Sequence, residues 1–224
     1  MDMNHCPVEC LVVGGVSLRK NHNLEITLPG IVNKSKRRSS LRENNKLRQR
    51  CTVLIEIAKS LGILYRDVNA PTTQKHYIET ILGAALWYLP TSRELWTGDI
   101  SLQALRDFHP DSGIAKPKLT EDHVFPRKVS AVELMKRSWD DQDQPEMMLE
   151  LYLKRYGLYN YVTPLENKRL VKYQKTHVFK APADSYQLAN VRLIRISLSD
   201  LELVKKRNGK AIEACINAQN NKEF

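Results

Sequence analysis

Apolar residues recur at helical spacing over much of the chain, and short segments of alternating polarity separate them. The first such face predicts a helix that Ser39 or Ser40 caps and Gly62 ends. Its apolar positions are Cys51, Leu54, Ile55, Ala58 and Leu61. A second helix is predicted over residues 72–89, with Pro90 closing it, and a shorter third helix over residues 101–108.

The two ends of the chain carry weaker patterns. Short alternating runs within residues 1–32 predict a hairpin. Near the other end, residues 191–198 predict a strand, and Ser199 is expected to cap a short helix. The last residues, 217–224, are polar and are expected to fray.

The centre of the chain carries two segments that belong together. An approach strand over residues 116–120 leads into Thr-Glu-Asp-His-Val-Phe-Pro-Arg-Lys at 120–128. Ser130 is expected to cap the helix that follows, residues 140–143 to break it, and Pro145 to begin another helix that Gly157 ends. A strand is then predicted over residues 158–162.

A helix start follows this second strand directly. Thr163 and Glu166 have the spacing of a capping box, and Pro164 occupies the first helical position. Asn167 then falls on the same side as Leu170 and Val171, so its amide is expected to face the core while the neighbouring cations point outward. A polar side chain aimed inward needs a partner, and a bound metal would be one.

Length and composition favour one domain. The chain has 224 residues with 42% apolar content, and no stretch is apolar for long enough to span a membrane. Its first residues lack the pattern of a signal peptide, and its four cysteines form no paired motif. We therefore expect a cytoplasmic protein with reduced cysteines and one mostly helical α+β domain.

The charge balance points to a nucleic-acid partner. Lysine and arginine number 35 against 25 acidic residues, for a net charge of +10. The densest basic run, in a helical arm predicted over residues 34–62, could track phosphates or be a solvated helix face. Its cations are Lys34, Lys36, Arg37, Arg38, Arg42, Lys46, Arg48 and Arg50.

Residues 118–175 resemble the HNH (His-Asn-His) endonuclease family, in which a two-stranded hairpin and a helix hold one divalent metal. The resemblance is carried by Asp-His-Val-Phe-Pro at 122–126, Asn-Tyr-Val-Thr at 160–163 and Glu-Asn-Lys at 166–168. The 37 residues from His123 to Asn160 imply a helical insertion between the strands of this ββα-metal finger. Asn160 and Asn167 stand closer together than is usual in the family, and the paired cysteines that brace many members are missing.

The resemblance implies a role for each matching residue. Asp122 is similar to the first metal ligand, His123 to the general base, Asn160 to the asparagine that braces the hairpin, and Asn167 to the ligand on the helix. Oxygen ligands of this kind favour Mg²⁺, or another divalent ion such as Mn²⁺. Arg127 and Lys128, and Lys168 after the helix ligand, could bind phosphate or be ordinary surface cations.

Two other interpretations remain open. Asp111, Glu166 and Lys168 match the acidic and E-x-K elements of PD-(D/E)xK nucleases. The capping box, however, places Glu166 and Lys168 at the start of a helix, where their side chains point in different directions. A non-catalytic nucleic-acid-binding protein is the other alternative. The expected activity is metal-dependent hydrolysis of DNA, with RNA not excluded, in restriction, defence, phage or mobile-element settings, and a homodimer would suit symmetric cleavage.

Overall fold

The structure is a computed structural model that describes residues 41–139 and 145–220. All of these residues fall within one compact unit. This unit is α+β and mostly helical, with one small mixed sheet, as the sequence predicts. The hairpin predicted within residues 1–32, the cations at 34–38 and the break at 140–143 lie outside the described residues.

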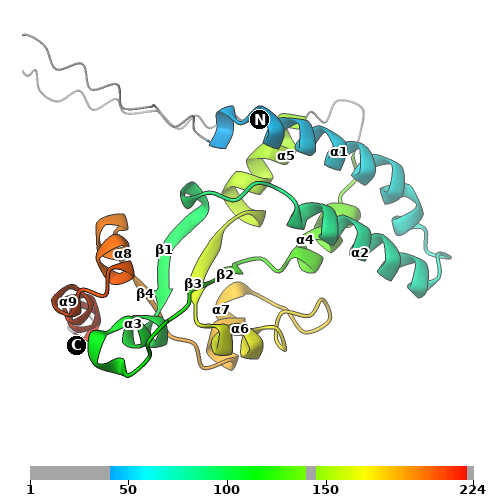
Figure 1. The fold of residues 1–224 in the computed structure, drawn as a ribbon. Helices are drawn as coiled ribbons and strands as arrows, with labels where there is room; N and C mark the ends of the chain where they lie inside the picture. Colours follow the sequence, from blue (N-terminus) through cyan, green and yellow to red (C-terminus); the bar gives the residue numbers. More distant parts are fainter. Residues whose placement is uncertain (1–40, 140–144, 221–224) are drawn as a thin grey trace, which may run out of the picture. The chain divides into compact units, whose positions relative to one another are not determined.

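The elements follow one another in the order shown in Figure 1. The α-helices are α1 (Asn45–Arg66), α2 (Thr72–Trp87), α3 (Leu102–Phe108), α4 (Arg127–Lys136), α5 (Pro145–Leu151), α6 (Pro164–Leu170), α7 (Pro182–Leu188), α8 (Leu198–Lys205) and α9 (Gly209–Asn220). The strands are β1 (Trp96–Ser101), β2 (Thr120–His123), β3 (Tyr159–Val162) and β4 (Leu193–Arg195). Short 3-10 turns are η1 (Leu41–Glu43), η2 (Arg93–Leu95) and η3 (Pro110–Ser112), and η4 (Tyr152–Tyr156) is a π-helical turn that continues α5.

The sheet has the strand order β2-β3-β1-β4. Strand β3 pairs antiparallel with β2 on one side and parallel with β1 on the other, and β4 pairs antiparallel with β1. In the β2–β3 register, Asp122 lies opposite Asn160 and His123 opposite Tyr159. The predicted pairing across a helical insertion is therefore confirmed, because residues 124–158 between these strands contain α4, α5 and η4.

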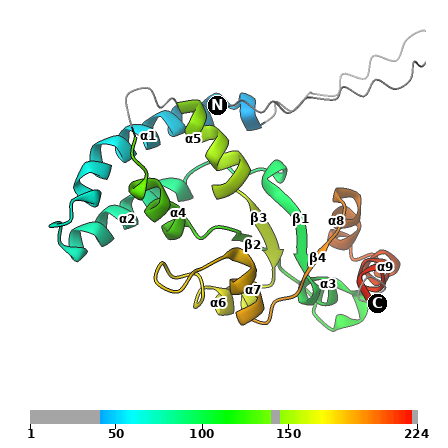
Figure 2. The same cartoon turned by 180° about the vertical axis from the view of Figure 1, so that it is seen from behind.

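The helices form two groups beside the sheet. Helices α1, α2, α4 and α5 pack against one another near the β2 edge, whereas α3, α8 and α9 pack together near the β4 edge, as both views show (Figures 1 and 2). The main core between these elements is apolar and includes Leu47, Ile55, Leu82, Leu105, Leu134 and Met148. A second, smaller cluster lies beneath α6 and α7 and consists of Val162, Leu170, Tyr186, Ala189 and Val191. Among the helices of the described ranges, none combines the length and apolar character needed to cross a bilayer.

Helix α1 differs from its prediction at both ends. Asn44, not a serine at 39 or 40, caps it, because the Asn44 side chain accepts a hydrogen bond from the Leu47 N–H. The helix also continues past Gly62 to Arg66. A β-carbon at Gly62 would lie 2.7 Å from Arg66 Nη1, so the missing side chain leaves room for this guanidinium. Arg66 Nη1 donates to the carbonyls of Met135 and Arg137, which ties α1 to the end of α4.

Four further boundaries were predicted wrongly. Ser130 lies inside α4, where its hydroxyl donates back to the Pro126 carbonyl, and Pro126 is the residue before the helix. Helix α8 is capped by Ser197 rather than Ser199, and β4 is shorter than the strand predicted over residues 191–198. The polar residues 217–220 continue α9 instead of fraying. By contrast, the third helix, the helix start at Pro145 and the capping box of Thr163 and Glu166 are confirmed.

Candidate active site

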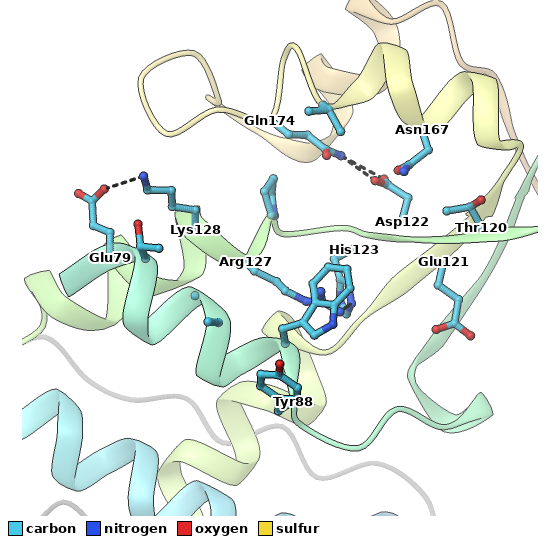
Figure 3. A pocket seen from close by; sticks show the side chains of 16 residues that line it. Glu79, Tyr88, Thr120, Glu121, Asp122, His123, Arg127, Lys128, Asn167 and Gln174 are labelled. Carbon is cyan, nitrogen blue, oxygen red and sulfur yellow. Dashed lines mark hydrogen bonds and ion pairs between the residues drawn. The ribbon is translucent and has the colours of Figure 1, made fainter. Parts of the chain in front are cut away.

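A groove of about 580 Å³ brings together the residues of the two central sequence segments. Strand β2 and helix α6 line one side of it, and α2 and the start of α4 line the other (Figure 3). Asp122 and His123 are consecutive on β2, so their side chains leave opposite sides of this edge strand. Figure 3 shows Asp122 on the side of Asn167 and Gln174, and His123 on the side of Arg127. The groove is lined by both groups because it runs along the edge of the sheet.

Asp122 is a buried carboxylate held by side chains from two different segments. Gln174 Nε2 donates to its two oxygens at 2.9 and 3.1 Å, and the Tyr186 hydroxyl donates to Oδ2 at 2.5 Å. Burial raises the pKa of Asp122, and the hydrogen bonds from Tyr186 and Gln174 act in the opposite direction. The carboxylate is thus fixed in orientation, while Oδ1, with one hydrogen bond, keeps a lone pair for a further partner.

Asn160 braces this carboxylate indirectly. Its Nδ2 donates to the Tyr186 hydroxyl at 3.0 Å, and its Oδ1 accepts from the Thr97 hydroxyl. The Asn160 amide therefore connects β1 to α7. It holds the Tyr186 hydroxyl in place, and that hydroxyl in turn orients the Asp122 carboxylate. Asn160 makes no hydrogen bond to His123 in the described part of the chain, so its place is that of a positioning residue.

His123 is kept neutral by its surroundings. Its Nε2 lies 2.8 Å from Arg127 Nη2, and because a guanidinium can only donate, Nε2 must be the unprotonated acceptor. Burial and the Arg127 charge lower the pKa of His123 to about 4. The backbone of Tyr156 acts in the opposite direction, but Nδ1 has no hydrogen-bond partner among the described residues.

Arg127 has unused hydrogen-bonding capacity at the floor of the groove. Its Nε and Nη1 atoms are buried without a partner in the described structure, and burial lowers its pKa to about 10. The guanidinium also lies over the Trp87 ring, with Cζ 3.2 Å from the ring centroid. Arg127 begins α4, and no side chain caps the first N–H groups of that helix. A cation and a helix N-terminus together favour an anion at this position.

Asn167 lies on the groove and not in the core. It is half-buried in the first turns of α6 and lines the groove together with the exposed Val171, whereas Leu170 is the residue that enters the core. The expectation of a core-facing amide is therefore wrong, although the side chain does point to the part of the groove that holds Asp122 (Figure 3).

The oxygen atoms of Asp122 and Asn167 fit a hard divalent cation such as Mg²⁺, which prefers carboxylate, amide and water oxygens. Within residues 41–139 and 145–220, no three His, Cys, Asp or Glu side chains gather closely enough to hold a metal ion. A cation bound by these two residues alone would need water and substrate oxygens to complete its coordination.

The other predicted phosphate-binding cations differ in their positions and in their partners. Lys128 lines the groove, but its Nζ lies 3.7 Å from the buried carboxylate of Glu79. Lys168 is exposed on α6 and does not line the groove. Arg42 forms an ion pair with Glu150, so it is not a free phosphate ligand, and Lys36, Arg37 and Arg38 lie outside the described residues.

The structure does not bring together the three residues on which the PD-(D/E)xK interpretation depends. Glu166 is buried in the capping box, where its Oε2 accepts from the Thr163 N–H and the Ser101 hydroxyl. Lys168 points outward from the same helix, and Asp111 is exposed in η3. These three side chains do not form one site, because Glu166 is used to join α6 to the end of β1.

Gln174, Tyr186 and Trp87 belong to the site but have no recognisable signal in the sequence. Trp87 and Tyr186 come from segments distant from the two motifs, whereas Gln174 lies in the turn that directly follows α6. Comparison with known proteins found no protein-family model, no curated protein and no solved structure that matches the chain.

Proposed function

We propose that the protein is a divalent-metal-dependent endonuclease that hydrolyses phosphodiester bonds of DNA through the ββα arrangement of β2, β3 and α6. The observation that carries this proposal is the β2–β3 register, which sets Asp122 and His123 beside Asn160 and brings Asn167 to the same groove on the next helix. These are the residue types that phosphodiester hydrolysis requires: oxygen ligands for a cation and a neutral base.

His123 would accept the proton of the attacking water. In the free protein its Nε2 is occupied by Arg127 Nη2. A phosphate that accepts hydrogen bonds from the guanidinium would draw Arg127 away and free this lone pair. Substrate binding would then also raise the basicity of the imidazole, because the neighbouring positive charge would be neutralised by the phosphate.

Asp122 and Asn167 would hold the cation on the other side of β2. When bound, the cation supplies positive charge to the nonbridging and leaving oxygens of the phosphate. Tyr186 and Gln174 keep the Asp122 carboxylate in one orientation, and Asn160 keeps Tyr186 in place. Arg127 and the start of α4 would bind the phosphate from the side of His123.

A plasmid-cleavage assay tests the proposal. The protein is incubated with supercoiled plasmid and Mg²⁺ or Mn²⁺, and in parallel with labelled duplex DNA, single-stranded DNA and RNA. Cutting should stop on chelation. His123→Ala and Asn167→Ala should each lower the rate by a factor of about 100 or more while DNA binding is retained.

Matched controls come from the same regions of the chain. His177 is an exposed histidine that does not line the groove, and Leu165 is exposed on α6 two residues before Asn167 and does not line the groove. His177→Ala and Leu165→Ala should cut at the parent rate. Binding without cutting of any substrate under several metals would favour the non-catalytic nucleic-acid-binding alternative, and undiminished cutting by His123→Ala would refute the proposed base.

A further inference from the structure

Beyond the reactive residues, the groove has an aromatic wall at the end of α2. Trp87 ends this helix and Tyr88 follows it, and both line the groove although they are 63% and 70% exposed. Trp87 and Tyr88 are consecutive and line the same groove, and contiguous exposed apolar surface of this kind marks interaction sites. In contrast, Trp96 and Trp139 are each only 8% exposed.

The Arg127 guanidinium contacts both the indole of Trp87 and the imidazole of His123. Arg127 places its Cζ 3.2 Å from the centroid of the Trp87 ring and its Nη2 2.8 Å from His123 Nε2. One guanidinium therefore separates the indole from the proposed base. A phosphate bound at Arg127 would keep its own nucleotide within reach of the aromatic wall.

We infer that Trp87, together with Tyr88, forms a subsite for an unstacked nucleobase next to the phosphate that is cut. This inference rests on the proposed function for the position of the phosphate, and it adds the class of substrate. The aromatic wall supplies a flat apolar surface, and every base has a π-face that can stack on such a surface irrespective of sequence. The buried, unpartnered Nε and Nη1 of Arg127 supply the complementary charge for the attached phosphate.

The subsite determines which nucleic acids fit. Inside a regular duplex both faces of each base are covered by its neighbours, so an aromatic side chain cannot stack on them. The base must be single-stranded, looped, at an end or flipped out of the helix. The protein should therefore prefer DNA with unpaired nucleotides over a perfect duplex of the same sequence.

Trp87 fluorescence tests the subsite without any cleavage. The metal-free protein is titrated with oligothymidylate while tryptophan emission is followed. Because Trp96 and Trp139 are buried, quenching on binding should come from Trp87 and should be absent in Trp87→Phe. Fluorescence anisotropy then compares a labelled duplex with the same duplex carrying a central unpaired bubble.

Trp87→Ala should weaken binding of oligothymidylate and of the bubble substrate by about 5- to 100-fold, and binding of the perfect duplex much less. Trp87→Phe should retain most of the affinity because it keeps an aromatic ring, which separates loss of stacking from loss of folding. Tyr77→Ala is the control, since Tyr77 is 69% exposed on the same helix but does not line the groove.

The possible failures are distinguishable. If oligothymidylate does not quench the parent protein, or if Trp87→Ala binds the bubble as tightly as the parent, the subsite is refuted even when plasmid cleavage persists. If Trp87→Ala instead changes only the oligomeric state, the aromatic wall is a protein interface and the subsite is equally refuted. Loss of the proposed nuclease activity with retained quenching would refute the function and leave the base-binding subsite supported.

Discussion

Glu166 joins the start of α6 to the end of β1, and it provides the sharpest test of how the groove is held in shape. Its Oε2 accepts from the Thr163 N–H at 2.9 Å and from the Ser101 hydroxyl at 2.5 Å, and all three residues are buried. Glu166→Ala would leave both donors without their acceptor. Hydrogen bonds to a charged group contribute about 1.5–3 kcal/mol each, and part of this is offset because a buried charge is removed.

We therefore expect Glu166→Ala to lower the free energy of unfolding by about 3 kcal/mol. Glu166→Gln keeps an acceptor oxygen and an allowed residue of the capping box, so it should cost about 1 kcal/mol. Leu165→Ala changes an adjacent side chain that is 69% exposed, and it should stay within about 0.5 kcal/mol of the parent. Urea unfolding followed by circular dichroism measures all three variants.

The same variants separate a structural glutamate from a metal ligand. At a temperature where Glu166→Ala remains folded, plasmid cleavage should persist, since the carboxylate does not line the groove. A stability equal to that of Leu165→Ala, together with complete loss of cutting by folded protein, would refute the structural role and revive the PD-(D/E)xK interpretation.

Two other predictions concern the residues in the groove. In the metal-free protein the pKa of His123 should be about 4, and Arg127→Gln should raise it toward 6.5, as measured by NMR titration of the imidazole assigned with His123→Gln. Because the pKa of His123 is lower in the folded than in the unfolded chain, the folding stability that is present above pH 6.5 should be lost as the pH falls toward 4. His123→Gln should lose less stability over this pH range. A pKa near 6.5 for His123 in the parent protein would contradict the prediction. Tyr186→Phe removes the hydroxyl that donates to Asp122 and accepts from Asn160 Nδ2. Thermal unfolding should therefore show a loss of stability of about 1–2 kcal/mol, and plasmid cleavage should slow about 10-fold or more. Parent-like values of both would show that Tyr186 does not hold Asp122 in place.

The sequence predicts those parts of the site that depend on local chemistry. The capping box fixes the start of α6 within four residues, because Thr163 and Glu166 satisfy each other's backbone groups. The strand predicted over residues 116–120 shares only Thr120 with β2, since residues 116–119 form no strand. By contrast, the pattern over residues 158–162 locates β3 (Tyr159–Val162) to within one residue. These signals are contained within a few residues, so they survive without knowledge of the tertiary structure.

The remaining parts depend on contacts between distant segments. Nothing near Tyr186 in the chain indicates that its hydroxyl meets Asp122, because the two residues are 64 positions apart in the sequence. Gly62 illustrates the same limit for helix ends. Glycine usually favours a helix end, but here the space beside it is filled by Arg66, which binds the carbonyls at the end of α4.

The strand pairing that creates the site also has a consequence for how the protein folds. A tight hairpin would form early, but β2 and β3 are separated by residues 124–158, and closing a loop of roughly 35 residues costs about 2 kcal/mol more than closing one of four. This cost is recovered only when α4 and α5 pack on α1 and α2. The pairing of Asp122 with Asn160 should therefore be completed late in folding, and residues 118–175 cut out as a separate peptide should not retain it.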